Sequence, residues 1–164
     1  MKILAIDPGY ERLGVAVIEK LPRQKETLLY SACLRTLKTL PHAKRLLKIA
    51  EEVRKVIEKF EPEAFAIETL FLMSNQKTVM PVAEARGAVL VEAARANLPV
   101  FEYSPLQIKV AVTGYGKSDK SQVTEMVKKL IALPEEKRLD DEYDAIAIGL
   151  TCLASQKWNT EHVV

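Results

Sequence analysis

The chain has 164 residues, of which 48% are hydrophobic and 28% charged, and a formal net charge of +2. This length suits one domain with a sizeable core and is too short for two ordinary ones. The balance of apolar and charged residues is typical of a folded protein and excludes a disordered one. A near-neutral total neither requires nor excludes a nucleic-acid binder, because basic residues can be concentrated locally.

Local sequence disfavours several other classes of protein. The apolar runs are short and interrupted by charges, so we expect no membrane span. The run over residues 3–6 is too short for a signal peptide and is followed by an acid. Cys33 and Cys152 lack the spacing of a zinc site and could pair, although a reduced pair is favoured. We therefore expect a cytoplasmic protein with one domain over residues 1–164.

The first third of the chain has the pattern of β-strands. An apolar run over residues 3–7 is followed by Pro8-Gly9, which is a turn signal. A β-rich segment over 13–19 comes next, and another over 27–36 follows a charged turn that contains proline. Strands at this spacing predict an antiparallel meander.

The remainder alternates between helical and strand patterns. Apolar residues that recur at intervals of three and four predict helices, and short apolar segments predict strands. These elements cover residues 42–60, 64–68, 83–94, 99–103, 123–130 and about 141–154. Ser118 or Asp119 is the expected N-cap of the third helix, and Pro81 predicts that the second begins late, near Thr78–Pro81. Together these elements predict an α/β fold whose mixed sheet is covered by helices.

Acidic residues stand at the ends of predicted elements. Asp7 and Glu68 each end an apolar strand, and neighbouring strands are about 4.8 Å apart, so their carboxylates could share an ion. Asp141 and Asp144, three residues apart on the last helix, share a face. Taken singly, these acids could be a turn, a solvated strand end and helix caps. Together they would repel one another without a compensating cation or proton, and oxygen ligands suit Mg²⁺ or Mn²⁺.

Motifs that contain these acids occur in an order typical of one protein family. The matching segments are Ile6-Asp7-Pro8-Gly9, Cys33-Leu34-Arg35-Thr36, Ala66-Ile67-Glu68 followed by Phe71, Glu84-Ala85-Arg86-Gly87-Ala88, Pro99-Val100-Phe101-Glu102-Tyr103, Gln107-Ile108-Lys109, Thr113-Gly114-Tyr115-Gly116-Lys117-Ser118-Asp119-Lys120-Ser121-Gln122-Val123 and Asp141-Glu142-Tyr143-Asp144-Ala145-Ile146-Ala147. The sequence resembles the RuvC family of bacterial Holliday junction resolvases over nearly its whole length.

The resemblance implies a ribonuclease H-like fold with a five-stranded mixed sheet and a homodimer that grips a four-way DNA junction. Each subunit would nick one of two symmetrically related strands, leaving 5′-phosphate and 3′-hydroxyl ends. Asp7, Glu68, Asp141 and Asp144 would bind two Mg²⁺ ions, for which Mn²⁺ would substitute. A branch-migration complex of RuvA and RuvB is the implied partner.

The resemblance also implies which residues contact DNA. Phe71 matches an aromatic residue of the family that stacks on an unpaired base. Without the resemblance, a phenylalanine here would be interpreted as a core residue. Lys109 and Lys120 match basic residues near the scissile phosphate, and Lys120 is included in the catalytic set. Lys117 and Arg86 are candidate backbone contacts, whereas isolated lysines are ordinarily solvated surface residues.

Departures from the family pattern and rival interpretations remain. The chain has Leu13-Gly14-Val15-Ala16 where resolvases commonly have Thr-Gly-aromatic-Gly, and Pro81 lies where the family helix is usually under way.

A YqgF-like nuclease would suit residues 11–16, but it leaves the segment around Lys117 unexplained. An actin-like ATPase would need two lobes. A non-catalytic junction binder would have no use for clustered acids, which repel DNA phosphates.

Overall fold

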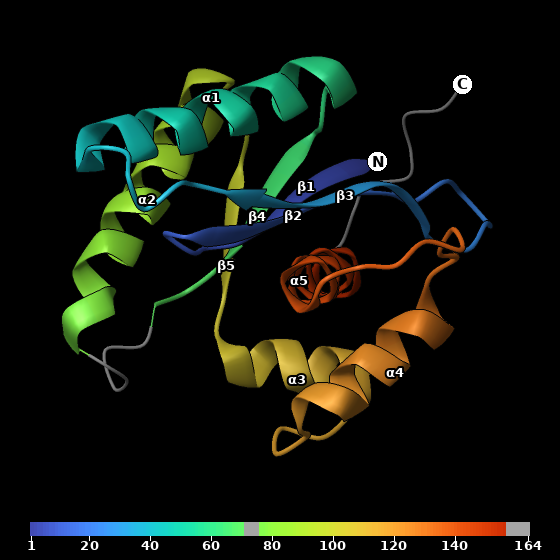
Figure 1. Cartoon of the computed structure of the whole chain (residues 1–164). Helices are drawn as coiled ribbons and strands as arrows, with labels where there is room; N and C mark the ends of the chain where they lie inside the picture. The colour runs from blue at the N-terminus through green and yellow to red at the C-terminus, as the bar shows by residue number, and fades with distance from the viewer. Residues whose placement is uncertain (71–75, 157–164) are drawn as a thin grey trace.

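The computed structural model describes residues 1–70 and 76–156. Its elements along the chain are β1 (Lys2–Asp7), β2 (Arg12–Glu19), β3 (Thr27–Arg35), α1 (His42–Phe60), β4 (Ala64–Glu68), α2 (Gln76–Arg95), β5 (Val100–Tyr103), α3 (Pro105–Thr113), α4 (Lys120–Leu130) and α5 (Asp140–Ser155) (Figure 1). The strands form one five-stranded sheet in the order β3-β2-β1-β4-β5. The predicted α/β class and mixed sheet are confirmed.

The sheet combines an antiparallel meander with a parallel half. β1 pairs antiparallel with β2, and β2 pairs antiparallel with β3, as the turn signals predict. β4 lies parallel to β1, and β5 lies parallel to β4. The carboxyl ends of β1, β4 and β5 therefore meet at the same edge of the sheet.

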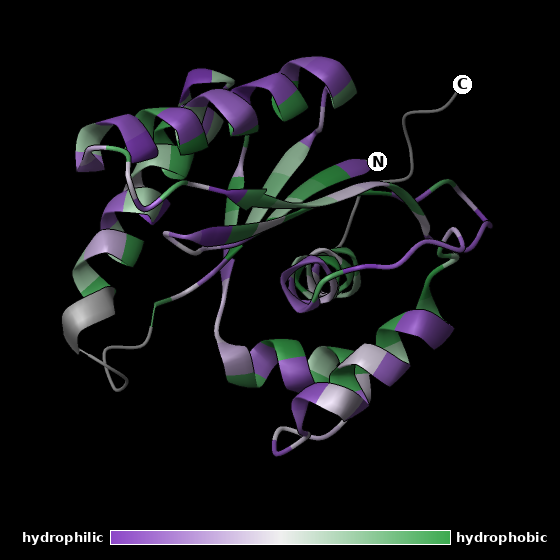
Figure 2. Cartoon of the chain, viewed as in Figure 1, coloured by the Kyte–Doolittle hydropathy of each residue, from purple (hydrophilic) through white to green (hydrophobic). Residues whose placement is uncertain are grey.

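Helices cover both faces of this sheet. α1 and α2 lie on one face, and α5 lies on the other with α3 and α4 outside it (Figure 1). Because side chains alternate along a strand, Ile3 and Ala5 pack towards α5, whereas Leu4 and Ile6 belong to the core beneath α1 and α2. In Figure 2, hydrophilic residues spread over the outer side of α1, which is the pattern of a helix that buries only one face.

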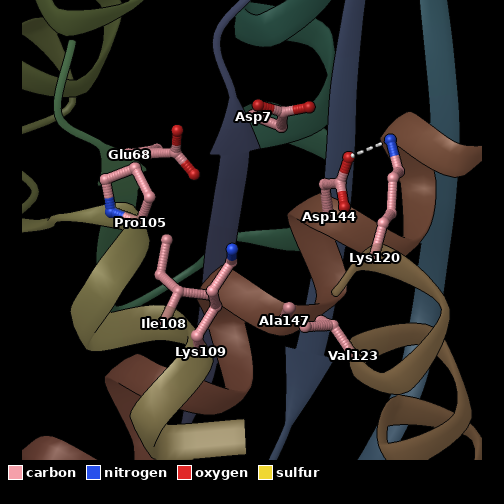
Figure 3. Close-up of a pocket in the computed structure, with 9 residues that line it drawn as sticks. All are labelled: Asp7, Glu68, Pro105, Ile108, Lys109, Lys120, Val123, Asp144 and Ala147. Carbon is pink, nitrogen blue, oxygen red and sulfur yellow. Dashed lines mark ion pairs between the residues drawn. The ribbon is translucent and has the colours of Figure 1, made fainter. Parts of the chain in front are cut away.

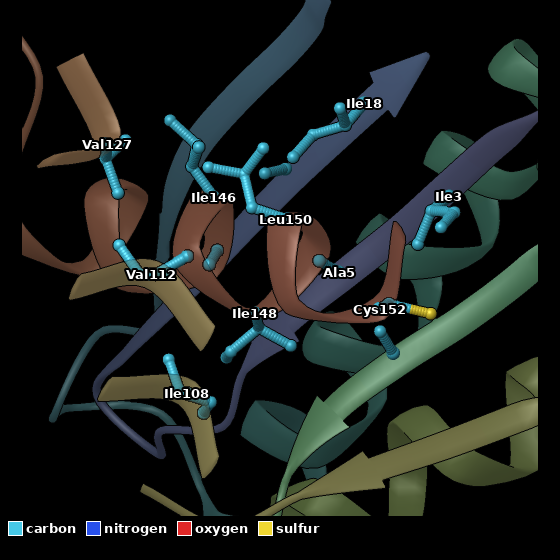
Figure 4. Packing of buried hydrophobic residues seen from close by; sticks show 14 of the residues in the cluster. Ile3, Ala5, Ile18, Ile108, Val112, Val127, Ile146, Ile148, Leu150 and Cys152 are labelled. Atoms are coloured by element: carbon cyan, nitrogen blue, oxygen red, sulfur yellow. The ribbon is translucent and has the colours of Figure 1, made fainter. Parts of the chain in front are cut away.

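Helix α5 is the most deeply buried helix on its face of the sheet. Ile146, Ile148 and Cys152 pack among side chains of β1, β2 and α3 (Figure 4). Gly149 allows this close packing, because an added Cβ there would lie 2.7 Å from Ile18 Cδ1 and 3.2 Å from Ala5 Cβ. The contact matters for function because α5 carries Asp141 and Asp144.

Gly149→Val is expected to lower the free energy of unfolding by about 1–3 kcal/mol, because the added atoms overfill a packed core. Chemical denaturation measures this change. Gly87→Ala on α2 is the matched control, since an added Cβ meets nothing within 4 Å there and alanine favours helix. Equal stabilities of the Gly149→Val variant and the wild type would contradict this account of how α5 approaches the sheet.

Two helices differ from the sequence prediction. α2 begins at Gln76 and contains Pro81, so the expected late start near Thr78–Pro81 was wrong. The proline removes the hydrogen bond to the carbonyl of residue 77, one turn before it. Because only five helical residues precede it, the loss is confined to the beginning of the helix. α3 was not predicted, although Ser104 and Gln107 form a capping box with Pro105 between them, a recognisable start signal.

Other expectations concern membrane spans and cysteines. Within residues 1–70 and 76–156, no helix is both long enough and apolar enough to cross a membrane. Cys33 and Cys152 are both free, which agrees with the expectation of an unpaired state.

Candidate active site

Asp7 and Glu68 lie next to each other at the carboxyl ends of two parallel strands. Ile6 on β1 is paired with Ile67 on β4, so the residues that follow them end adjacent strands. Both side chains are on the α5 face by the alternation that points Ala5 and Ala66 there. The predicted adjacency of these two acids is therefore a consequence of the parallel register.

Asp144 and two lysines join these acids around one pocket. The pocket has a volume of about 230 Å³. Figure 3 shows Asp7, Glu68 and Asp144 around it, with Lys109 from α3 and Lys120 from α4 beside them. Its remaining lining residues are apolar: Pro105, Ile108, Val123 and Ala147. Five elements thus bring charged side chains to one partly apolar cavity.

The carboxylates of the pocket disfavour one another's ionised forms. The pKa of Asp7 is raised well above its ordinary value of 3.8, first by burial and then by the charges of Asp144, Glu68 and Asp141. Burial and Asp144 raise the pKa of Glu68 from 4.5 to about 7, although Lys109 lowers it. A cation bound among these oxygens would relieve both the repulsion and the cost of burial.

Lys120 is the nearest positive charge to Asp144. Its Nζ lies 2.9 Å from Asp144 Oδ2 and 3.8 Å from Asp140 Oδ2. Partial burial opposes the charged form of the lysine, but the hydrogen bond and charge of Asp144 dominate and raise the pKa of Lys120. Burial likewise raises the pKa of Asp144, against the opposing effect of Lys120. Lys120 therefore remains a cation at neutral pH.

Asp141 is close to the pocket but does not line it. Its Oδ2 accepts a hydrogen bond from Arg12 and lies 3.7 Å from Cys33 Sγ. Among the described residues, no group of three or more acidic, histidine or cysteine side chains is arranged to hold a metal ion. The structure therefore brings three of the four predicted acids to one pocket and orients the fourth towards Arg12.

The backbone around Asp141 is nevertheless packed tightly beside Asp7. A Cβ added to Gly14 would lie 2.0 Å from the carbonyl oxygen of Asp141 and 3.1 Å from Asp7 Cβ. Only glycine at this position on β2 allows the beginning of α5 to lie so close to the end of β1.

Comparison with known proteins identifies the family. Residues 3–152 match the sequence model described as crossover junction endodeoxyribonuclease RuvC. A protein of that name from Thermotoga petrophila is 43% identical over 149 residues, which are 91% of this chain and 90% of the relative. Another, from Desulforamulus reducens, is 43% identical over 150 residues, which are 92% of this chain and 91% of the relative.

The chain belongs to the RuvC family. It is accordingly a crossover junction endodeoxyribonuclease, an enzyme that resolves Holliday junctions. The structure of Thermus thermophilus RuvC in complex with a Holliday junction substrate has a TM-score of 0.87 at 36% identity, and the match covers 94% of this chain and 93% of that one. The RuvC match confirms the expected ribonuclease H-like fold.

The remaining residues predicted from the RuvC resemblance have different surroundings. Lys117 is exposed in the turn between α3 and α4. Arg86 is largely enclosed: it donates to the carbonyl oxygen of Glu68 at 3.3 Å and pairs with Glu102. Its contact with DNA remains a prediction, whereas its contact with the backbone of Glu68 links α2 to the pocket. Phe71 lies outside the described residues.

Sequence reasoning missed Arg12 as a neighbour of the RuvC acids. It lies at the start of β2, and nothing in the local sequence signals its pairing with a residue 129 positions away. The apolar side of the pocket was also missed, because Pro105 and Ile108 belong to the unpredicted α3. The capping box at Ser104 was the available signal for that helix.

Proposed function

We propose that this RuvC family member cuts four-way DNA junctions at the pocket formed by Asp7, Glu68 and Asp144. The observation that carries the proposal is the convergence of these three acids with Lys109 and Lys120. The Thermus thermophilus relative is described in complex with a Holliday junction substrate, which supports the same class of DNA as the substrate here. Residues 1–164 would act as one nuclease domain.

We propose Asp7, Glu68, Asp141 and Asp144 as the residues that hold two Mg²⁺ ions. The donor set fits this metal: all four side chains offer oxygen, which Mg²⁺ and Mn²⁺ prefer. The raised pKa values of Asp7 and Glu68 reflect burial and then the charge of neighbouring carboxylates, both of which a bound cation would offset. When bound, two such ions supply activation of the attacking water and stabilisation of the departing 3′ oxygen. Products with 5′-phosphate and 3′-hydroxyl ends follow from that chemistry.

The lysines of the pocket would act on the phosphate itself. Lys109 and Lys120 reach the pocket from separate helices, α3 and α4. Fixed positive charges at a cleaved phosphate orient it and offset the negative charge that develops on its oxygens. Lys120 would exchange its partner Asp144 for the phosphate when DNA binds, because the same ammonium group serves both anions.

Lys120→Ala is expected to lower the cleavage rate of a bound junction by about 10²-fold, the scale of losing one electrostatic contact to a transition state. Junction affinity should fall much less, since many other phosphate contacts remain. Single-turnover cleavage and a binding titration in Ca²⁺ separate the two effects. Lys128→Ala, on an exposed part of the same helix, is the control. An unchanged cleavage rate for Lys120→Ala would show that Lys120 has no role at the cleaved phosphate.

Three further residues are proposed as DNA contacts. Lys117 is exposed next to α4 and would contact the phosphate backbone, as would Arg86 if DNA reaches its guanidinium. Phe71 follows Glu68 closely in the sequence and would stack on an unpaired base at the junction centre.

Phe71→Ala is expected to slow cleavage more than it weakens binding, because stacking of about 1–3 kcal/mol would be used to hold the base pairs open at the cut. Junctions with unpaired bases at the crossover provide the comparison. The variant should recover part of its rate on these substrates. Wild-type rates on fully paired junctions would remove the stacking role.

The proposed assembly is a homodimer in the cytoplasm that works with a RuvA–RuvB branch-migration complex. Two active sites related by symmetry account for two symmetrical nicks.

Incubation with a synthetic four-way junction and Mg²⁺ tests the proposed function. The expected result is a pair of symmetrical nicks with ligatable ends. Linear duplex and RNA–DNA hybrid are the controls, and equal cleavage of either one would contradict selectivity for junctions.

A further inference from the structure

Arg12 is a cation next to the active site, and the cleavage chemistry proposed above does not use it. Its guanidinium is bound to Asp141 Oδ2, and its side chain is 47% exposed, whereas that of Asp141 is 20% exposed. The pair joins the first residue of β2 to the first turn of α5. The ion pair is therefore partly exposed at the protein surface, where bound DNA would displace solvent.

The pairing determines where the Asp141 carboxylate lies. Oδ2 is directed to Arg12 and to Cys33 Sγ on β3, and Asp141 does not line the pocket that its neighbours form. Asp144, one helical turn later, also has a lysine partner, but Lys120 itself lines the pocket. Within the described part of the chain, Arg12 is thus the charged partner that directs Asp141 away from the other three acids, with the Cys33 thiol beside it.

We propose that Arg12 is an exchangeable counter-ion of Asp141 that couples metal loading to DNA binding. In the DNA-free protein it occupies the carboxylate and competes with a divalent cation for it. On the junction the guanidinium passes to a phosphate of the bound strand, and Asp141 turns to the pocket. This inference rests on the proposed role of Asp141 as a metal ligand.

The chemistry of arginine suits this exchange. A guanidinium binds carboxylate and phosphate oxygens with the same fork of N–H donors, so it can pass from Asp141 to DNA without losing its hydrogen bonds. The contact with Asp141 is partly exposed, and such ion pairs are weak enough to be displaced. A divalent cation with several oxygen ligands competes with it effectively.

Calorimetric titration with Ca²⁺ at low salt tests the proposal, since Ca²⁺ takes the same oxygen ligands and we expect junction binding without cleavage in its presence. Wild type, Arg12→Gln and Arg12→Lys are titrated alone and saturated with a four-way junction, and the heat of Ca²⁺ binding to DNA alone is subtracted. We expect Arg12→Gln to bind Ca²⁺ about five-fold more tightly than the wild type without DNA, the scale of one partly exposed ion pair. On the junction the two proteins should bind Ca²⁺ equally. Arg12→Lys, which keeps the charge, should resemble the wild type.

The controls separate this inference from the proposed function. Lys38→Gln removes an equally positive side chain that pairs with Glu11 at 3.2 Å and should leave Ca²⁺ affinity unchanged. Asp141→Asn should weaken Ca²⁺ binding, and if it does not, the ligand assignment fails and the role of Arg12 fails with it. If Asp141→Asn weakens binding but Arg12→Gln matches the wild type, only the competition is overturned. A five-fold difference that persists on the junction would show that Arg12 does not leave Asp141, which overturns the coupling.

Discussion

Asp7→Asn is expected to reduce junction cleavage by on the order of 10³-fold or more, a scale typical of lost electrostatic stabilisation in an active site, while junction binding persists. Asp7 ends β1 beside the end of β4 and is partly buried, and its ionised form is disfavoured first by this burial and then by three neighbouring carboxylates. This position makes it the acid most dependent on a compensating cation. Asparagine keeps the shape of the side chain but removes the charge that would hold the cation.

Single-turnover cleavage and junction binding in Ca²⁺ measure the two properties of the Asp7 variant. Binding is expected to equal or exceed that of the wild type, because the substitution removes negative charge from a surface that approaches phosphates. Asp140→Asn is the control: Asp140 begins α5 but is 75% exposed and lies outside the pocket. Cleavage by Asp7→Asn at the wild-type rate would refute the active-site assignment.

Glu68→Gln is expected to raise the stability of the metal-free protein at pH 8 by about 1–2 kcal/mol, after allowance for solvent screening, which corresponds to about 3–6 °C in the thermal midpoint. The pKa of Glu68 is raised to about 7 in the folded protein, from an ordinary value of 4.5. A carboxyl group whose pKa rises on folding stabilises the fold when protonated, and this contribution is lost as the pH rises from about 4.5 through about 7. At pH 8 the wild type therefore contains an unfavourable, partly buried charge that glutamine lacks.

Thermal denaturation at pH 4.5 and pH 8, with and without Mg²⁺, measures this effect. The difference between the Glu68 variant and the wild type should shrink at pH 4.5, where Glu68 is protonated in the folded state. A ligand that binds the folded state raises its stability. Mg²⁺ should therefore stabilise the wild type more than the variant, because glutamine lacks the carboxylate charge that would hold the ion. Glu125→Gln, on the exposed side of α4, should show neither trend. A Glu68 variant less stable than the wild type at pH 8 would show that the pocket does not disfavour this charge.

Much of the site could be predicted because strand ends can be read locally. Asp7 and Glu68 each terminate an apolar run, and their adjacency needs only the parallel pairing of the two strands. Asp144 followed from its spacing on the last helix and from the family motifs, whereas Lys120 came from the motifs alone, and their 2.9 Å contact agrees with a shared site. The mixed sheet likewise followed from alternating patterns, since local periodicity determines which face of each element is buried.

The features that could not be predicted involve contacts between distant segments. The pairing of Arg12 with Asp141 depends on how α5 lies across β2, which in turn depends on the absence of a side chain at Gly14. The enclosure of Arg86 by Glu102 and the backbone of Glu68 depends on the position of α2 beside β5. The early start of α2 was missed because Pro81 was given the weight of a helix-breaking residue, although one missing hydrogen bond near a helix end is tolerated.

The sequence alone determined the order of the strands and of the helices other than α3, the charged residues of the pocket and the family to which the chain belongs, because these depend on local patterns and ordered motifs. Only the tertiary structure decided which of the acids point into a common pocket and which cations accompany them. The physical reason is that side-chain direction at the site is set by packing and charge pairing among β1, β4, α3, α4 and α5. Those interactions join residues far apart in the chain, and no local pattern encodes them.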